Sequence, residues 1–303
     1  MADHNQKSEF KESGEIPIRE IFEVLWDKKI IILVATLIVS VLGYIYSISL
    51  TDLYESETLV ISNNDGAQSP FSQLGGVASF IGAEIPSTGG EQVEHSIELM
   101  KSREFLKHLL QFEEVLPSIM AVDSFDEETY KIVFNSEIYD PNSKQWLKNN
   151  IFKGDPTYLK THTIYKNDLL TINHDKLTGI LRIKITHESP IFAKKLLELV
   201  IQETNNILRN IDLNESQEAL SHLNEEISKT QLIQVKNSLF TLVQSQLERQ
   251  MMAKINEDFA LKIIDPPFIP ESPSSPRRNL LLLLSAFFGS FLGIFFVLYK
   301  KYF

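Results

Sequence analysis

The chain has 303 residues, no cysteine and a formal net charge of −11. Without cysteine it has neither disulfides nor thiolate metal sites, so packing alone must stabilise it. The acidic charge argues against nucleic acid as a partner, because binding phosphates needs a basic face. It serves either solubility or the selection of a partner by charge.

Residues 1–29 are expected to form a cytoplasmic tail that ends in an amphipathic helix. Five apolar residues recur at helical spacing on one face, namely Ile18, Ile21, Phe22, Leu25 and Trp26. The pattern predicts a helix in the membrane interface, with Trp26 at headgroup depth. Alternatively, the segment simply extends the membrane helix that follows it.

Two uncharged apolar runs predict transmembrane helices over residues 30–50 and 280–299. A helix of this length, at 1.5 Å per residue, crosses a hydrocarbon core of about 30 Å. Lys28 and Lys29 precede the first run and acids follow it, so the N-terminus is expected in the cytoplasm. With two spans, residues 300–303 return to the cytoplasm as a short tail, and the segment between the spans is extracytoplasmic.

Each span contains small residues four positions apart. Gly43 and Ser47 lie in the first span, and Gly289 and Gly293 lie in the second. This spacing lets two helix backbones approach closely. The motif fits packing within one chain or between chains, and it also occurs by chance.

The extracytoplasmic domain, residues 51–265, starts with an alternating stretch that predicts a strand over 54–62. A long loop follows and carries an apolar, glycine-containing run with Leu74, Gly75, Gly76, Phe80 and Gly82. Loops of this length are usually functional or mobile. The run either packs under the domain or contacts the bilayer, a neighbouring subunit or a partner protein.

The middle of the domain is expected to be mixed. An apolar stripe predicts a helix over residues 91–111, and residues 123–150 are expected to hold only short helices. Residues 169–174 and 179–187 alternate apolar and polar side chains, which predicts an antiparallel hairpin.

A long helical arm is predicted over about residues 190–258. Ser189–Pro190 is an efficient helix start, and Asp212 begins a capping-box pattern that favours a bend or a new helix. Leucines at near-heptad spacing indicate coiled-coil-like packing, with a chain reversal within 229–238. A closing strand is expected over 259–265.

A proline segment, residues 266–279, joins this strand to the second span. It contains Pro266, Pro267, Pro270, Pro273 and Pro276, followed by Arg277 and Arg278. Polyproline II repeats every three residues, so the spacing places proline rings on one face. We expect a stiff strut that holds the domain at a set height above the membrane.

Motifs for catalysis, cofactors or metals are not found in the sequence. It has no G-x-x-x-x-G-K-[ST] phosphate loop and no G-x-S-x-G elbow, and its seven histidines lack ligand spacing. We therefore predict no catalytic, metal-binding or cofactor-binding residue, no cofactor, and a protein that is not an enzyme.

The order of these elements resembles the Wzz-type chain-length determinants, or polysaccharide co-polymerases, over nearly the whole chain. The most specific part is Phe259–Arg278 (FALKIIDPPFIPESPSSPRR), which looks like the family's strand, proline motif and basic pair. Weaker similarities lie in Ile18–Lys29, Leu74–Gly82, Ile97–Arg103 and Ser189–Ala193.

The resemblance implies a two-pass bacterial inner-membrane protein with an α+β periplasmic domain, which forms a ring-shaped homo-oligomer in contact with membrane lipids. It implies control of the length of lipopolysaccharide O-antigen or a related polymer, with a Wzy-type polymerase and lipid-linked polysaccharide as partners. The chain lacks a phosphate loop and so resembles the kinase-free class. The alternatives are an export co-polymerase for capsule or exopolysaccharide working with a separate tyrosine kinase, and a membrane-anchored periplasmic sensor, which the short tails disfavour.

Overall fold

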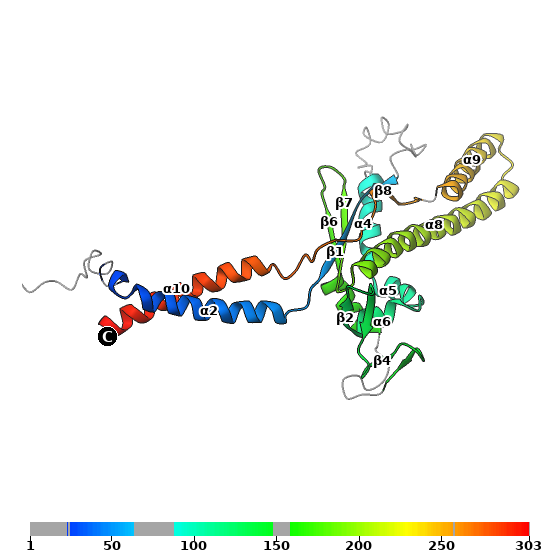
Figure 1. The fold of residues 1–303 in the computed structure, drawn as a ribbon. Coiled ribbons are helices and arrows are strands. Elements are labelled where there is room, and N and C mark those ends of the chain that lie inside the picture. The colour runs from blue at the N-terminus through cyan, green and yellow to red at the C-terminus, as the bar shows by residue number, and fades with distance from the viewer. Residues whose placement is uncertain (1–22, 24, 64–87, 148–157, 257, 303) are drawn as a thin grey trace, which may run out of the picture. The chain divides into compact units, whose positions relative to one another are not determined.

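The computed structural model describes residues 23, 25–63, 88–147, 158–256 and 258–302. These residues belong to two compact units: residues up to 52 together with those from 275 onward, and residues 53–274 (Figure 1). The predicted interfacial residues Ile18, Ile21 and Phe22 lie outside the described residues. So does the predicted apolar loop with Leu74, Gly75, Gly76, Phe80 and Gly82.

The first unit consists mainly of two antiparallel helices, α2 (Lys29–Ser49) and α10 (Arg278–Tyr302), which lie side by side (Figure 1). Their mean hydropathies of 2.4 and 2.5 and their lengths suit membrane spans. Both helices include basic residues at their ends, because a helical lysine or arginine keeps its charge at the interface by extending its side chain.

The second unit is built on a four-stranded antiparallel sheet in the order β6-β7-β1-β8. The strands are β1 (Tyr54–Ser62), β6 (Leu170–His174), β7 (Leu181–His187) and β8 (Leu261–Asp265). The predicted first strand, hairpin and closing strand are thus confirmed. Because β1 lies between β7 and β8, the first and last strands of the unit are neighbours in one sheet, and β8 forms its edge.

One face of this sheet forms the core. Register pairs such as Thr58–Ile183 and Val60–Leu181 are fully buried, and helices α4 (Thr88–Lys101) and α8 (Pro190–Lys229) pack near them. The alternation of buried and partly exposed residues along β1 matches the period of two expected for a strand with one covered face.

The opposite face of the sheet carries an ion-pair network. Lys184 Nζ lies 2.7 Å from Glu55 and 3.1 Å from Glu57, and Arg182 lies 2.8 Å from Glu57. Burial alone would raise the pKa of Glu57, but the bond from Lys184 and the two cationic charges outweigh it and lower that pKa. The bond to Glu55 correspondingly raises the pKa of Lys184.

Shorter helices complete the base of the unit. The predicted helix over 91–111 is interrupted at Ser102, whose Oγ accepts a hydrogen bond from the Phe105 N–H (3.1 Å) and caps α5 (Arg103–Leu109). Helix α6 (Val115–Met120) follows. Helix α7 (Tyr158–Ile164) continues into a π-helical turn, η3 (Tyr165–Leu169).

The prediction of short helices over residues 123–150 is wrong for the described part of that stretch. It forms two hairpins, and their strands are β2 (Val122–Asp126), β3 (Lys131–Phe134), β4 (Tyr139–Asp140) and β5 (Gln145–Trp146). Asp126 and Asp140 each bind backbone N–H groups and a hydroxyl within the turn that follows, which favours a turn over a helix.

The helical arm consists of α8 and α9 (Ile233–Ile255), which folds back along it (Figure 1). Ser189 caps α8 through a hydrogen bond from the Phe192 N–H, and the chain reverses between Lys229 and Ile233, as predicted. Asp212 does not start a new helix. Helix α8 runs unbroken through this position, and the buried Asp212 carboxylate pairs with Arg249 of α9.

Candidate interaction surfaces

The small residues of the two spans meet at the interface between α2 and α10 of the same chain. A Cβ added to Gly289 would lie 2.8 Å from the Thr36 Cα, and one added to Gly293 would lie 3.0 Å from the Ile32 Cα. A Cβ on Gly43 would lie 2.5 Å from the Ser285 Cβ, and Ser47 is buried at the same interface. The backbones therefore approach as closely as glycine permits, within one chain.

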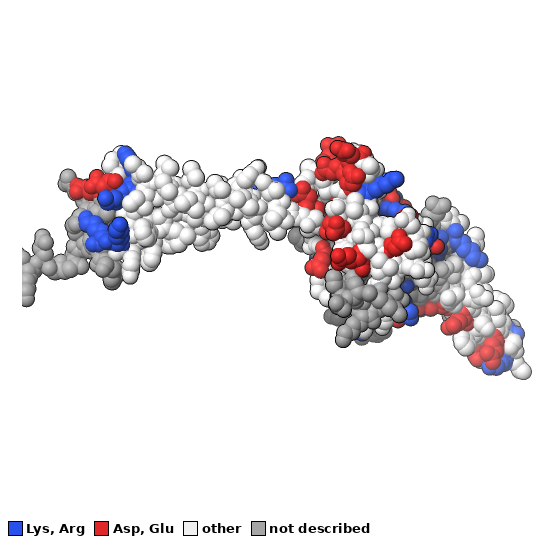
Figure 2. Space-filling model, turned by 60° about the horizontal axis from the view of Figure 1, so that its bottom comes forward, with Lys and Arg blue, Asp and Glu red and all other residues white. Residues whose placement is uncertain are grey.

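The two ends of this helix pair differ in charge. Arg278 NH2 lies 2.9 Å from both carboxylate oxygens of Asp52. At the other end, Lys28 and Lys29 precede the body of α2 while Lys300 and Lys301 lie in the last turn of α10. Between these two ends, the surface of the helix pair in Figure 2 shows no charged side chains.

The proline segment is attached to the sheet. The Ser56 hydroxyl donates to the Phe268 carbonyl (2.7 Å), and the Leu53 carbonyl accepts from the Ser274 N–H (2.8 Å). Pro267 and Pro270 are buried, whereas Pro266 and Pro273 are exposed, and the backbone bends at residues 271 and 272. Proline suits this position beside an edge because it has no N–H to leave unpaired. Pro276, Arg277 and Arg278 belong to the other unit.

Asn205 holds the point where the arm returns to the sheet, and sequence reasoning did not single it out. This buried side chain binds the backbone at the start of β8 through three hydrogen bonds to Ala260 and Leu261. A nearby pair, His108 Nε2 and Glu203 Oε2 at 2.5 Å, links α5 to the same helix α8. These contacts fix the root of the arm.

Helix α9 carries an apolar stripe that stays exposed among the residues that the structure describes. Its members lie on one helical face, each is at least 47% exposed, and we call them the α9 stripe: Ile233, Phe240, Leu247, Met251 and Ile255. A contiguous apolar surface of this kind indicates an interaction site.

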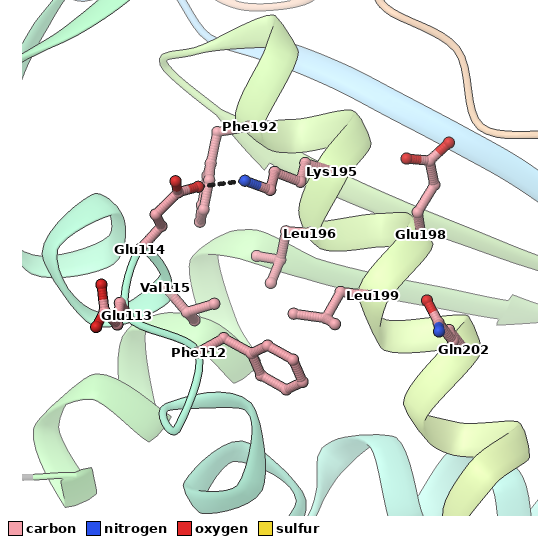
Figure 3. A pocket seen from close by; sticks show the side chains of 10 residues that line it. All are labelled: Phe112, Glu113, Glu114, Val115, Phe192, Lys195, Leu196, Glu198, Leu199 and Gln202. Carbon is pink, nitrogen blue, oxygen red and sulfur yellow. Dashed lines mark hydrogen bonds and ion pairs between the residues drawn. The ribbon is translucent and has the colours of Figure 1, made fainter.

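A pocket of about 410 Å³ opens between the residues before α6 and the first turns of α8 (Figure 3). Phe112, Val115, Leu196 and Leu199 form its apolar part. The carboxylates at its rim are paired: Glu113 with Lys144, Glu114 with Lys195 and Glu198 with Lys194. The pocket is thus suited to an uncharged group, because its charges already neutralise one another.

No group of three or more His, Asp or Glu side chains is placed to hold a metal ion among the residues that the structure describes.

The first helical residues include Leu25 and Trp26 of the predicted interfacial helix, and Lys29 Nζ lies 4.7 Å from the centre of the exposed Trp26 ring.

Residues 14–112 match the family model Wzz, "Chain length determinant protein". Residues 224–302 match a second model, GNVR, "G-rich domain on putative tyrosine kinase". The chain contains a Wzz domain and a GNVR domain. The resemblance drawn from the sequence is confirmed, and so is the mixed fold with a long helical arm and a candidate membrane helix near each end. No curated protein matches the sequence significantly.

Two of the solved structures similar to this Wzz-domain protein are described by their function. One is described as "full-length bacterial polysaccharide co-polymerase", with 13% identity and a TM-score of 0.40 over 94% of this chain and 97% of that chain. The other is a fragment of WzzB, a polysaccharide co-polymerase from Salmonella Typhimurium, with 13% identity and a TM-score of 0.29 over 74% and 100%. Because both TM-scores are below 0.5, the assignment rests on the two sequence matches.

Proposed function

We propose that this protein sets the length of a polysaccharide, such as lipopolysaccharide O-antigen, as a non-catalytic co-polymerase of a Wzy-type polymerase. One observation carries the proposal. The Wzz segment supplies α2 and β1, the GNVR segment supplies α10 and β8, and the two segments pair with each other in both units. The two matched segments therefore act as one structural element, which supports a shared function.

We further propose a homo-oligomeric ring, for which the α9 stripe offers an apolar surface that would bring the arms of neighbouring subunits together. Chain length would then follow from the geometry of the ring and its contact with the polymerase and the lipid-linked polysaccharide. The proline segment would orient the base of each subunit, because its buried prolines attach it to β1.

The proposed location is the bacterial inner membrane, with both termini cytoplasmic and residues 51–279 periplasmic. Four lysines flank one end of the helix pair and two arginines flank the other, which supports this orientation because the more basic end is expected in the cytoplasm. The chain has no cysteine, so Leu177→Cys at the exposed hairpin tip provides a single labelling site. A maleimide that crosses the outer membrane but not the inner membrane should label Cys at position 177 in whole cells. The variant Trp26→Cys should react with it only after lysis.

The decisive experiment is deletion of the gene, followed by electrophoresis of the surface polysaccharide. Loss of a modal length while polymer is still made would support a length regulator. An unchanged ladder would contradict it. Purified protein should transfer no sugar, which separates this function from that of a glycosyltransferase.

The GNVR match favours a second candidate, an export co-polymerase for capsule or exopolysaccharide that works with a separate tyrosine kinase. In that case deletion would abolish the surface polymer rather than alter its length, and the protein would co-purify with a kinase. A normal amount of polymer with altered length would reject this alternative.

A further inference from the structure

The helix pair gathers positive charge at one end. Ile32 of α2 lies against Gly293 of α10, and the helices run in opposite directions. At 1.5 Å per residue, Lys29 lies about 4.5 Å and Lys300 about 10 Å beyond this contact along the axis. We call Lys28, Lys29, Lys300 and Lys301 the lysine end; all four are exposed.

This arrangement has an electrostatic cost that the described residues offset only in part. Glu23 and Asp27 are the acids nearest to the lysine end in the described sequence, where four lysines outnumber them, and Glu23 and Lys301 each have an interaction partner. The close glycine packing that joins α2 to α10 places the two basic helix ends beside each other.

The position of the lysine end determines which counter-ion is at hand. The lysine end lies at one end of two helices whose length and composition suit a membrane span. Trp26 and Tyr299 are exposed beside it. Aromatic and basic side chains at the end of a span lie at headgroup depth. A basic cluster there attracts anionic lipid by about 1 kcal/mol per residue, which is about fivefold for each lysine.

We propose that the lysine end binds the phosphate of anionic phospholipid headgroups, which act as counter-ions between α2 and α10. The inference does not depend on the proposed function, because it requires only that the helix pair spans a bilayer.

The chain permits a direct test, because it has two tryptophans and one of them, Trp26, lies at the lysine end. In the full chain with Trp146→Phe, the single tryptophan reports on neighbouring lipid. Nanodiscs would contain phosphatidylcholine with phosphatidylglycerol, and one or the other lipid would be brominated to quench fluorescence. We expect brominated phosphatidylglycerol to quench Trp26 at least fivefold more per lipid than brominated phosphatidylcholine.

The charge-removing variant carries Lys28→Gln, Lys300→Gln and Lys301→Gln and keeps Lys29, which contacts Trp26. It should lose the preference. Replacement of the same three lysines by arginine should keep it, as should Arg277→Gln at the opposite end. Equal quenching by both lipids in the parent chain, or an unchanged preference in the glutamine variant, would overturn the proposal. A preference abolished by soluble glycerol phosphate would also overturn it, since the site would then recognise free phosphate.

Discussion

The side-chain amide of Asn205 binds both backbone polar groups of Leu261. Nδ2 donates to the Leu261 carbonyl (3.0 Å), and Oδ1 accepts from the Leu261 N–H (2.8 Å). The same Oδ1 accepts from the Ala260 N–H (2.9 Å). One residue of α8 thus completes the backbone hydrogen bonding at the start of β8, where the chain returns from the arm to the sheet.

Asn205→Ala should destabilise the protein strongly. The change leaves buried backbone groups without partners, and each such group costs about 1–3 kcal/mol. We expect a loss of about 2–4 kcal/mol, measured as a lower midpoint of thermal unfolding of the full chain in detergent. Gln202→Ala, on the exposed side of the same helix, is the control and should change little. A midpoint that is equal in the two variants would contradict the assigned role.

Gly289→Leu should separate α2 from α10. An added Cβ would meet the Thr36 backbone at 2.8 Å, and backbone cannot move aside as a side chain can. Overpacking of this kind costs about 1–3 kcal/mol, which should lower the thermal midpoint. Phe291→Leu, on an exposed position of the same helix, is the matched control. If both variants unfold at the parent temperature, the glycine contact does not hold the pair together.

Pro267→Ser combined with Pro270→Ser should loosen the proline segment from β1. These two prolines are buried beside the bond from Ser56 to Phe268, and serine restores backbone freedom to the unfolded segment. Cleavage by a glutamate-specific protease after Glu271 should become faster, and under the proposed function the polysaccharide ladder should broaden. Pro266→Ser with Pro273→Ser alters two exposed prolines and serves as control. Unchanged cleavage and an unchanged ladder would remove the segment from the mechanism.

The local patterns in the sequence predicted most of the elements but not how they join. Alternation found β1, and Ser189–Pro190 marked the start of α8, since both signals lie within a few residues. Asn205 and Ser56 had no such signal, because their partners are backbone groups 56 and 212 residues away. Gly289 and Gly293 could be selected by spacing, while their pairing with α2 of the same chain required the structure.

The missed hairpins did have a signal. Three turns share the pattern D-x-x-[ST], beginning at Asp126, Asp140 and Asp175, and in each the aspartate binds an N–H two residues on and a hydroxyl three residues on. The next residue in each turn has positive φ: Tyr130, Lys144 and Gly179. Only the third has the glycine that usually reveals such a turn.

Phe240→Ser combined with Leu247→Ser should weaken self-association without unfolding the chain. Both side chains belong to the α9 stripe and are about half exposed, so their loss creates no cavity in the core. We expect smaller particles by native mass spectrometry, while an unchanged far-ultraviolet circular dichroism spectrum would show that the chain remains folded. Gln244→Ser changes a polar residue between them and should leave the particle size unchanged. The same oligomer in the double variant would exclude the stripe as an interface.

His187 should make the fold sensitive to mild acid. Its Nε2–H donates to the Ser118 carbonyl (2.7 Å), its Nδ1 accepts from the Ser189 N–H (2.9 Å), and burial lowers its pKa below the ordinary 6.5. Because the unfolded chain then binds more protons than the folded chain, stability falls as the pH drops below about 6.5.

Burial and Asp123 raise the pKa of Glu188, which acts with the opposite sign at lower pH, so a Glu188→Gln background isolates the histidine. In that background the thermal midpoint should fall between pH 7.5 and 5.5, less so after His187→Gln, which retains a donor for Ser118. The control His222→Gln, on the exposed side of α8, should leave the pH profile unchanged. If the thermal midpoint depends on pH to the same extent with His187 as with Gln at position 187, the role of His187 is contradicted.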